Sequence, residues 1–302
     1  MIEEKKKVAL ISVFAAIFLT GFKLIIGVLT GSIGILSEAL HSGFDLVAAV
    51  ITYFSVRISD KPADKNHNFG HGKIENFSAF IQTILLVITC IWILYEAINR
   101  LVSGNTHIEV NIWSYIVIIS SIVIDISRSR ALSKVAKKYN SQALEADALH
   151  FSTDIWSSAV VLLGLICANF GFYFADSIAA LFVAIFVLVV SYKLGKRAAE
   201  ALLDKAPLGT INLIEKKLTT LANFSEIKHF HSLKVRTAGA DTFIKFNIHL
   251  DPDLSLQQVH EICDKVENEI KKDLHRSEVF IHAEPQNSLH IKTENEDELN
   301  NI

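Results

Sequence analysis

Long apolar runs fill the N-terminal part of the chain, and each is about the length of a bilayer-spanning helix. Such a helix needs roughly 20 mostly apolar residues. The fourth run is short, and the second and fifth contain ionisable residues, but the pattern still predicts six transmembrane helices. They are expected at about residues 8–30, 33–57, 78–101, 111–128, 145–168 and 173–195.

The segments between these runs differ in charge. Lys and Arg are frequent before run one, between runs two and three, between runs four and five, and after run six. The other connecting segments contain no Lys or Arg. Positive loops stay in the cytoplasm, so both termini are expected there. The basic start could be mistaken for a signal peptide, but the run that continues to Leu29 is too long and lacks a cleavage site.

After about residue 207 the pattern becomes that of a soluble domain. Between 240 and 250 apolar and polar residues alternate as in a strand, and Val259, Ile262 and Val266 recur at helical spacing after the N-cap candidate Ser255. The elements predict a small αββαβ fold. The expected organisation is a transmembrane domain over 1–206, a cytoplasmic domain over 207–286 and a disordered acidic tail over 287–302.

Composition agrees with a membrane protein and excludes several other classes. Hydrophobic residues make up 51% of the chain, and the mean hydropathy is +0.36, which is high for a soluble protein. The formal net charge of −3 gives no reason to expect nucleic acid as a partner. The three cysteines form no C-x-x-C pair, so neither a disulfide framework nor a thiolate zinc site is indicated.

Two of the predicted helices carry the same polar pattern, acid-x-x-His-x-x-x-Asp. Steps of three or four residues keep side chains on one helix face. If the two helices pack together, two imidazoles and two carboxylates converge, which is enough for a tetrahedral zinc site. Such donors suit zinc, cobalt, nickel or iron better than calcium or magnesium. The sets are Glu38, His41 and Asp45 in the second helix, and Asp147, His150 and Asp154 in the fifth.

The alternative interpretation is that these polar residues only pack helices together. An ionised Asp inside a bilayer costs roughly 2.5–3.5 kcal/mol on insertion scales and usually marks an ion path. Two matching His–Asp pairs therefore favour metal binding. Because imidazole and carboxylate also bind protons, metal binding would displace H⁺, and a proton gradient could drive turnover.

Further motifs carry a resemblance over nearly the whole chain. They are SEALHSGFD at 37–45, PADKNHNFGHGKIE at 62–75, DALHFSTD at 147–154, Leu203-Asp204 and IHAEP at 281–285. With these the sequence resembles the cation diffusion facilitator family. The resemblance implies a homodimeric metal/proton antiporter, not an enzyme, with alternating access at His41, Asp45, His150 and Asp154. His at position 41 looks like the zinc-preferring members, with iron or manganese as the alternative substrate.

The same resemblance implies sites outside the membrane. Asp64, His67 and His71 match a second metal site in the loop between helices two and three. Lys73 and Asp204 match an ion pair between subunits. For regulatory zinc in the cytoplasmic domain, Asn247 stands where the family usually has His, and His249 is its possible substitute. The candidate ligands there are His231, His249, His260, His282 and Glu284.

Two other functional classes are open at this stage. An intramembrane metalloprotease would need an H-E-x-x-H helix and an open metal position, and the chain has no such motif. A metal-sensing membrane scaffold would bind metal without transporting it, and the intact pair of His–Asp motifs argues against it. The compact size and the lack of a histidine-rich loop between helices four and five favour a bacterial inner membrane over an organelle membrane.

Overall fold

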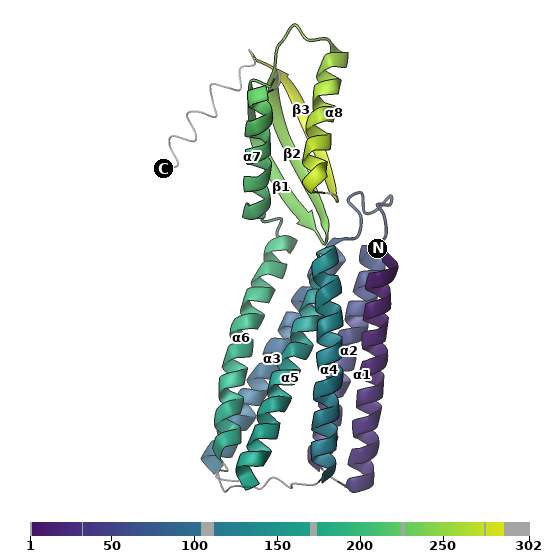
Figure 1. Ribbon diagram of the computed structural model, residues 1–302, viewed down its shortest axis with the longest axis vertical. Helices are drawn as coiled ribbons and strands as arrows, with labels where there is room; N and C mark the ends of the chain where they lie inside the picture. The colour runs from purple at the N-terminus through teal and green to yellow at the C-terminus, as the bar shows by residue number, and fades with distance from the viewer. Residues whose placement is uncertain are drawn as a thin grey trace. The chain divides into compact units, whose positions relative to one another are not determined.

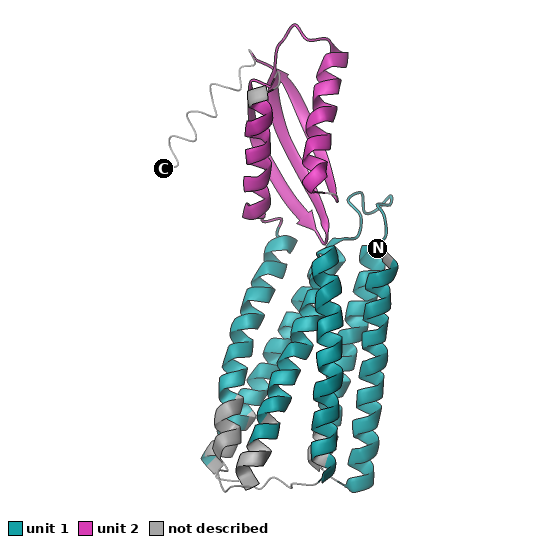
Figure 2. Cartoon of the chain, viewed as in Figure 1, with its two compact units in different colours: residues 1–203 teal, residues 204–302 magenta. Residues whose placement is uncertain are grey.

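The chain folds into two compact units in the computed structural model, residues 1–203 and residues 204–302 (Figure 2). The structure describes residues 2–31, 33–103, 112–169, 174–224, 227–274 and 276–286. The predicted acidic tail over 287–302 lies outside the described residues, as do residues 104–111 and 170–173.

Unit 1 is a bundle of long helices (Figure 1), and the described residues contain the six that the sequence predicts. By length and composition, three described segments are apolar enough to cross a membrane: Glu3–Thr30, Glu38–Ser59 and Lys73–Asn99. The helices are α1 (Ile2–Thr30), α2 (Ile33–Ser59), α3 (Lys73–Ser103), α4 (Ile112–Tyr139), α5 (Gln142–Asn169) and α6 (Phe174–Leu202).

Helix α4 extends well past residue 128, where its apolar run ends. Its last turn carries Lys137 and Lys138, which are good helix formers but poor partners for lipid. Hydropathy therefore detects only the apolar part of this helix, and the helix continues beyond the expected membrane boundary.

Small residues line the contacts between the helices. Ala9 of α1, Ala49 of α2 and Ala148 of α5 are almost fully buried, which lets the backbones approach closely. Helix α3 packs along α6, and there a Cβ added at Gly195 would lie 2.7 Å from Cγ2 of Thr83. The bundle is therefore held by close backbone packing.

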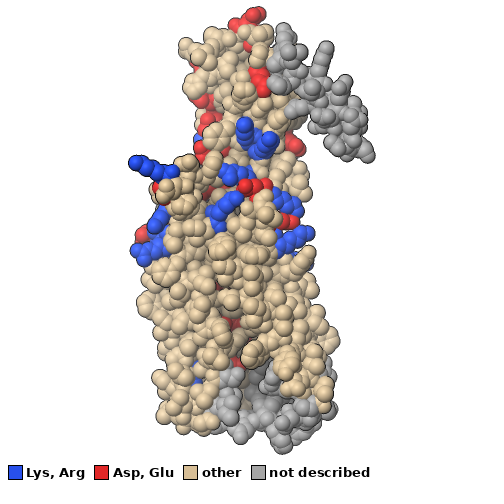
Figure 3. All heavy atoms as spheres, turned by 180° about the vertical axis from the view of Figure 1, so that it is seen from behind, with Lys and Arg blue, Asp and Glu red and all other residues tan. Residues whose placement is uncertain are grey.

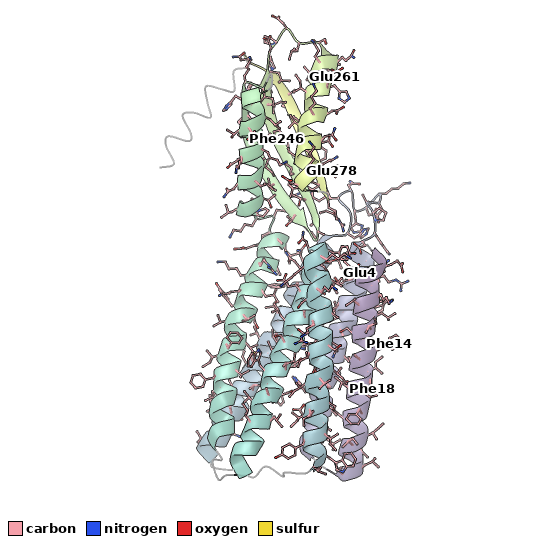
Figure 4. All side chains as sticks on the ribbon, viewed as in Figure 1. Glu4, Phe14, Phe18, Phe246, Glu261 and Glu278 are labelled. Atoms are coloured by element: carbon pink, nitrogen blue, oxygen red, sulfur yellow. The ribbon has the colours of Figure 1, made fainter. Side chains whose placement is uncertain are left out.

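The outward face of the bundle suits lipid. Phe14 and Phe18 of α1 point away from the neighbouring helices (Figure 4), and each is 62% exposed. Figure 3 shows one face of the molecule, on which Lys and Arg gather in a band while most of the bundle surface carries no charged side chain. Exposed aromatic and aliphatic surface of this extent marks a membrane-facing surface.

A buried polar network ties helix ends together in unit 1. Lys5 of α1 donates to Asp60 at 2.8 Å and to Glu75 of α3 at 2.9 Å. Glu75 also accepts hydrogen bonds from Ser59 of α2 at 3.0 Å and from Ser141, just before α5, at 2.5 Å. Because Glu75 accepts three hydrogen bonds, one of them from an ammonium group, it can be buried as an ion. The network fixes the ends of α2 and α5 relative to each other.

Unit 2 has the predicted αββαβ order, and its sheet order is β1-β2-β3. β1 pairs antiparallel with β2, and β3 pairs parallel with β2 after the α8 crossover. Ile244, Phe246 and Ile248 of β2 are completely buried in the core formed with α7 and α8. The elements are α7 (Leu208–Phe224), β1 (His229–Ala238), β2 (Asp241–Leu250), α8 (Leu256–Asp273) and β3 (Ser277–Pro285).

Alternation along β2 places Asn247 and His249 on the face of the sheet opposite this core. Helix α8 starts at a capping box, in which Ser255 accepts from the backbone of Gln258 and the Gln258 side chain accepts from the backbone of Ser255. The capping box fixes the start of α8, and Ile262, Val266 and Ile270 pack the helix against the core face of the sheet.

Candidate metal centre

Helices α2 and α5 bring together the four side chains of the repeated His–Asp motif, called the bundle cluster here. The Nε2 of His150 lies 3.0 Å from Oδ1 of Asp45 and 3.8 Å from Oδ2 of Asp154. The Nε2 of His41 lies 3.7 Å from Oδ1 of Asp154 and 4.0 Å from Oδ1 of Asp45. Each Asp therefore contacts the imidazoles of both helices, as the spacing predicts for two packed helices.

Burial makes this cluster suited to binding a desolvated ion. The side chains of Asp45, His150 and Asp154 are 11%, 7% and 13% exposed, and that of His41 is 34% exposed. A cavity of about 50 Å³ is lined by His41, Asp45 and Asp154, whose ligand atoms lie within 4.8 Å of one another. Within the described residues, Oδ2 of Asp154 is buried with no hydrogen-bond donor. A cation would satisfy that oxygen.

The acids that open each motif have other partners. Glu38 lines the same cavity but lies 3.1 Å from the ammonium of Lys23. Asp147 is fully buried and accepts a 3.5 Å hydrogen bond from Ser12 of α1. In each helix the His and the following Asp thus belong to the bundle cluster, and the first acid of the motif binds a residue of α1 instead.

Sequence reasoning missed three charged residues around this cavity. Lys23 and Asp125 line it, and Arg128 lies 3.2 Å from Asp125. The signal that could have found them is the rule that a charge within an apolar helix faces the bundle interior and has a partner.

The loop between α2 and α3 gathers Asp64, His67 and His71, called the loop cluster. Asp64 lies 3.2 Å from Nδ1 of His67 and 3.4 Å from Nε2 of His71. Gly70, with a φ of +74°, makes the turn and donates to the carbonyl of His67. The backbone N–H groups of His67 and Asn66 donate to Asp64 and lower the pKa of its carboxyl group. Asp64 therefore stays ionised and able to bind a cation.

Three strands build a further group in unit 2, the sheet cluster of His231, His249 and Glu284. The Nε2 atoms of both histidines lie 3.6 Å from Oε2 of Glu284. His249 is directly opposite Glu284 in the register, and Asn247 donates to Oε1 of Glu284 at 2.8 Å. Asn247 thus orients the carboxylate although it is a poor ligand itself.

A bulge between His231 and Lys234 shapes this cluster. At the bulge, Ser232 has a φ of +55°, and such irregularities redirect neighbouring side chains. His229 also belongs to this region, since its ring stacks 6.0 Å from the rings of both His231 and His249. Its position depends on the pairing of His229 with His249, which spacing along the chain does not reveal.

Two predicted ligands of unit 2, His282 and His260, lie outside the buried part of the sheet cluster. His282 is 66% exposed, with its Nε2 3.5 Å from Oε1 of Glu284. His260 is not brought to the sheet cluster, because α8 covers the opposite face of the sheet. Its side chain is 74% exposed and lies 3.5 Å from Asp264.

The predicted ion pair between Lys73 and Asp204 joins residues of different units and stays a prediction. Within unit 1, Lys73 donates to the carbonyl of Leu202 at 3.2 Å. Within unit 2, Asp204 lies 3.8 Å from Arg236.

A helical bundle with an apolar outer surface and an inward His–Asp donor set defines an integral membrane transporter of metal cations. The chain belongs to the cation efflux, or cation diffusion facilitator, family. Residues 9–203 match the model described as "Cation efflux transmembrane domain", and residues 212–286 match "Cation efflux protein, cytoplasmic domain". It is a divalent-metal efflux transporter and not an enzyme.

Similar proteins come from bacteria and archaea. A cation-efflux pump of Shewanella oneidensis is 30% identical over 282 residues, which are 91% of this chain and 92% of that protein. An uncharacterised transporter of Methanocaldococcus jannaschii is 31% identical, over 93% of this chain and 98% of that protein. The metal-bound C-terminal domain of the CzcD transporter from Thermotoga maritima is 26% identical, with a TM-score of 0.24, over 26% of this chain and 93% of that structure.

Proposed function

We propose that this transporter exports Zn²⁺ in exchange for protons and that the bundle cluster is its transport site. The observation that carries the proposal is the convergence of two imidazoles and two carboxylates from α2 and α5. Four nitrogen and oxygen donors match the tetrahedral geometry of zinc. The donor set contains no thiolate, which would favour permanent retention of zinc over release. Iron and manganese are the alternative substrates.

Proton exchange follows from the chemistry of the ligands. Imidazole nitrogen and carboxylate oxygen must lose protons to bind a metal, so metal and protons compete for the same atoms. Because the cluster is buried, an alternating-access change is needed to open it to each side. We propose a homodimer for this change, which the name of the matched cytoplasmic-domain model also suggests.

The proposed location is a bacterial inner membrane with both termini in the cytoplasm. Lys and Arg occur in the terminal segments and alternate loops and are absent from the remaining loops, which supports this orientation. The loop cluster and the sheet cluster would then face cytoplasmic zinc. We assign them a regulatory role in sensing the metal that the bundle exports.

The test is metal flux into proteoliposomes under an imposed pH gradient. Zinc, iron and manganese are compared for the wild-type chain and for Asp45→Ala. Zinc-selective flux that needs the gradient and is lost in the variant is the expected result. Flux that favours iron or manganese would overturn the substrate, and zinc flux that is independent of the gradient would overturn the antiport. Zinc binding with no flux of any metal would favour the metal-sensing scaffold.

A further inference from the structure

The cavity at the bundle cluster is lined by four carboxylates of two kinds. Asp45 and Asp154 face His41 and His150, which belong to the proposed ligand set themselves. Glu38 and Asp125 instead face permanent cations, Lys23 at 3.1 Å and Arg128 at 3.2 Å. A metal ion that enters the cavity therefore meets two carboxylates without a Lys or Arg partner, Asp45 and Asp154. The other two, Glu38 and Asp125, are already paired with a cation.

Lys23 is held tightly in this arrangement. Its side chain is 5% exposed, and its ammonium group donates to Glu38 and, at 2.9 Å, to Ser42 of α2. A buried ammonium is costly unless it is paired and hydrogen-bonded. Lys23 therefore needs a counter-ion, and its contact with the 42% exposed Glu38 side chain keeps that carboxylate oriented toward α1.

Arg128 holds the second acid in a similar way. Its guanidinium group lies 3.5 Å from the centroid of the Phe151 ring and donates to Ser12 at 3.1 Å and 3.3 Å. Stacking and directed hydrogen bonds fix an arginine more firmly than a lysine. Glu38 and Asp125 are thus each paired with a buried cation and held away from the ligands of the bundle cluster.

Glu38 is placed beside the ligands of the bundle cluster. It lies three residues before His41, so both side chains occupy one face of α2, and both line the cavity. A free carboxylate at that point adds donors to the four of the bundle cluster. More oxygen donors favour ions that prefer six-coordinate, oxygen-rich shells, such as Mn²⁺, over tetrahedral Zn²⁺.

We propose that Lys23 is a positioning residue that determines metal specificity by keeping Glu38 out of the coordination shell. This inference rests on the proposed function, since it concerns the same transport site. Lys23 touches no metal; it acts through Glu38, so its effect must disappear when Glu38 can no longer act as a carboxylate.

The experiment compares Mn²⁺ and Zn²⁺ flux into proteoliposomes for four variants of the full chain and the wild type. Lys23→Met frees Glu38, and Lys23→Gln does so with a polar, uncharged side chain in case the methionine variant does not fold. Lys23→Arg keeps the cation. The double variant Lys23→Met with Glu38→Gln removes the charge of both partners. Size-exclusion chromatography of each protein checks that it is folded.

We expect the Mn²⁺/Zn²⁺ flux ratio to rise roughly tenfold in Lys23→Met and Lys23→Gln, since partners of metal ligands alter affinity by roughly 10–100-fold. Lys23→Arg should keep the wild-type ratio, and in the double variant the ratio should fall back to the wild-type value. An unchanged ratio in a folded, transporting Lys23→Gln would overturn the proposal, as would a double variant that keeps the altered ratio. Absence of flux in the wild type would instead contradict the proposed function.

Discussion

The bundle cluster and the sheet cluster use the same ligand types but are assembled in different ways. In the bundle, His and Asp lie four residues apart on one helix, so helical geometry fixes each pair before any packing occurs. In unit 2, His231, His249 and Glu284 come from three strands, and their distances depend on strand register and on the bulge at Ser232. In the bundle only the meeting of the two pairs depends on packing, that of α2 against α5, whereas every distance in the sheet cluster depends on strand pairing.

The two clusters also differ in charge. The bundle cluster contains two carboxylates, Asp45 and Asp154. Glu38 and Asp125 lie nearby, paired with Lys23 and Arg128. The sheet cluster has one carboxylate, which also accepts a hydrogen bond from Asn247. With only one carboxylate, the sheet cluster is expected to bind a divalent metal more weakly than the bundle cluster. This difference agrees with the proposed roles, transport for the bundle cluster and regulation for the sheet cluster.

The largest effect is expected from removing a bundle ligand. Asp45→Ala or His150→Ala should reduce zinc flux by more than about 100-fold, since even the loss of an outer partner costs roughly 10–100-fold in affinity. Flux into proteoliposomes measures this, with the exposed Asp251→Asn of unit 2 as the control. Normal flux in a folded Asp45→Ala protein would remove the bundle cluster from the transport path.

A smaller effect is expected in the sheet cluster. His249 is 1% exposed and faces Glu284, so His249→Ala should weaken zinc binding at this cluster more than roughly tenfold. Flux at saturating zinc should remain. Titration calorimetry on the full chain measures zinc affinity and the number of zinc ions bound per chain. His260→Ala on α8 is the matched control. Equal losses in both variants would show that the ligand set is different from the one assigned here.

The loop cluster gives a prediction about pH. Hydrogen bonds from the backbone lower the pKa of Asp64, so its carboxyl group should titrate below the ordinary value of about 3.9. A lowered folded-state pKa contributes stability above the unfolded value, and this contribution is lost as the pH falls through the folded value. At neutral pH, Asp64 is thus available to metal. Carboxyl NMR titration of the chain, with Asp64→Asn to assign the signal, tests this; a midpoint above about 3.9 contradicts it.

The smallest effect concerns α8. Ser255→Ala removes the capping box and should lower the free energy of unfolding of unit 2 by about 1 kcal/mol. Because α8 contributes no ligand to the sheet cluster, zinc binding should not change. Denaturant unfolding measures the change in stability, and titration calorimetry measures zinc binding. A lost zinc equivalent in this variant would mean that α8 and His260 belong to the site.

The sequence predicts local features well and non-local ones poorly. Six apolar runs and the αββαβ order are confirmed, since period and length depend on neighbouring residues. The His–Asp spacing also predicts which four side chains meet between α2 and α5. Strand register is set by pairing between distant segments, so the stacking of His229 and the separate position of His260 could not be predicted. The Lys23–Glu38 pair likewise depends on how α1 packs against α2.

The central claim is that zinc binds directly to the four residues of the bundle cluster. Zinc X-ray absorption on a chain that carries His67→Ala and His249→Ala tests it, because these substitutions disable the loop and sheet clusters. We expect two imidazole nitrogens at about 2.0–2.1 Å and two carboxylate oxygens at about 2.0–2.2 Å, a shell that disappears when Asp45→Ala is added. A six-oxygen shell, or a spectrum that Asp45→Ala leaves unchanged, would contradict the claim.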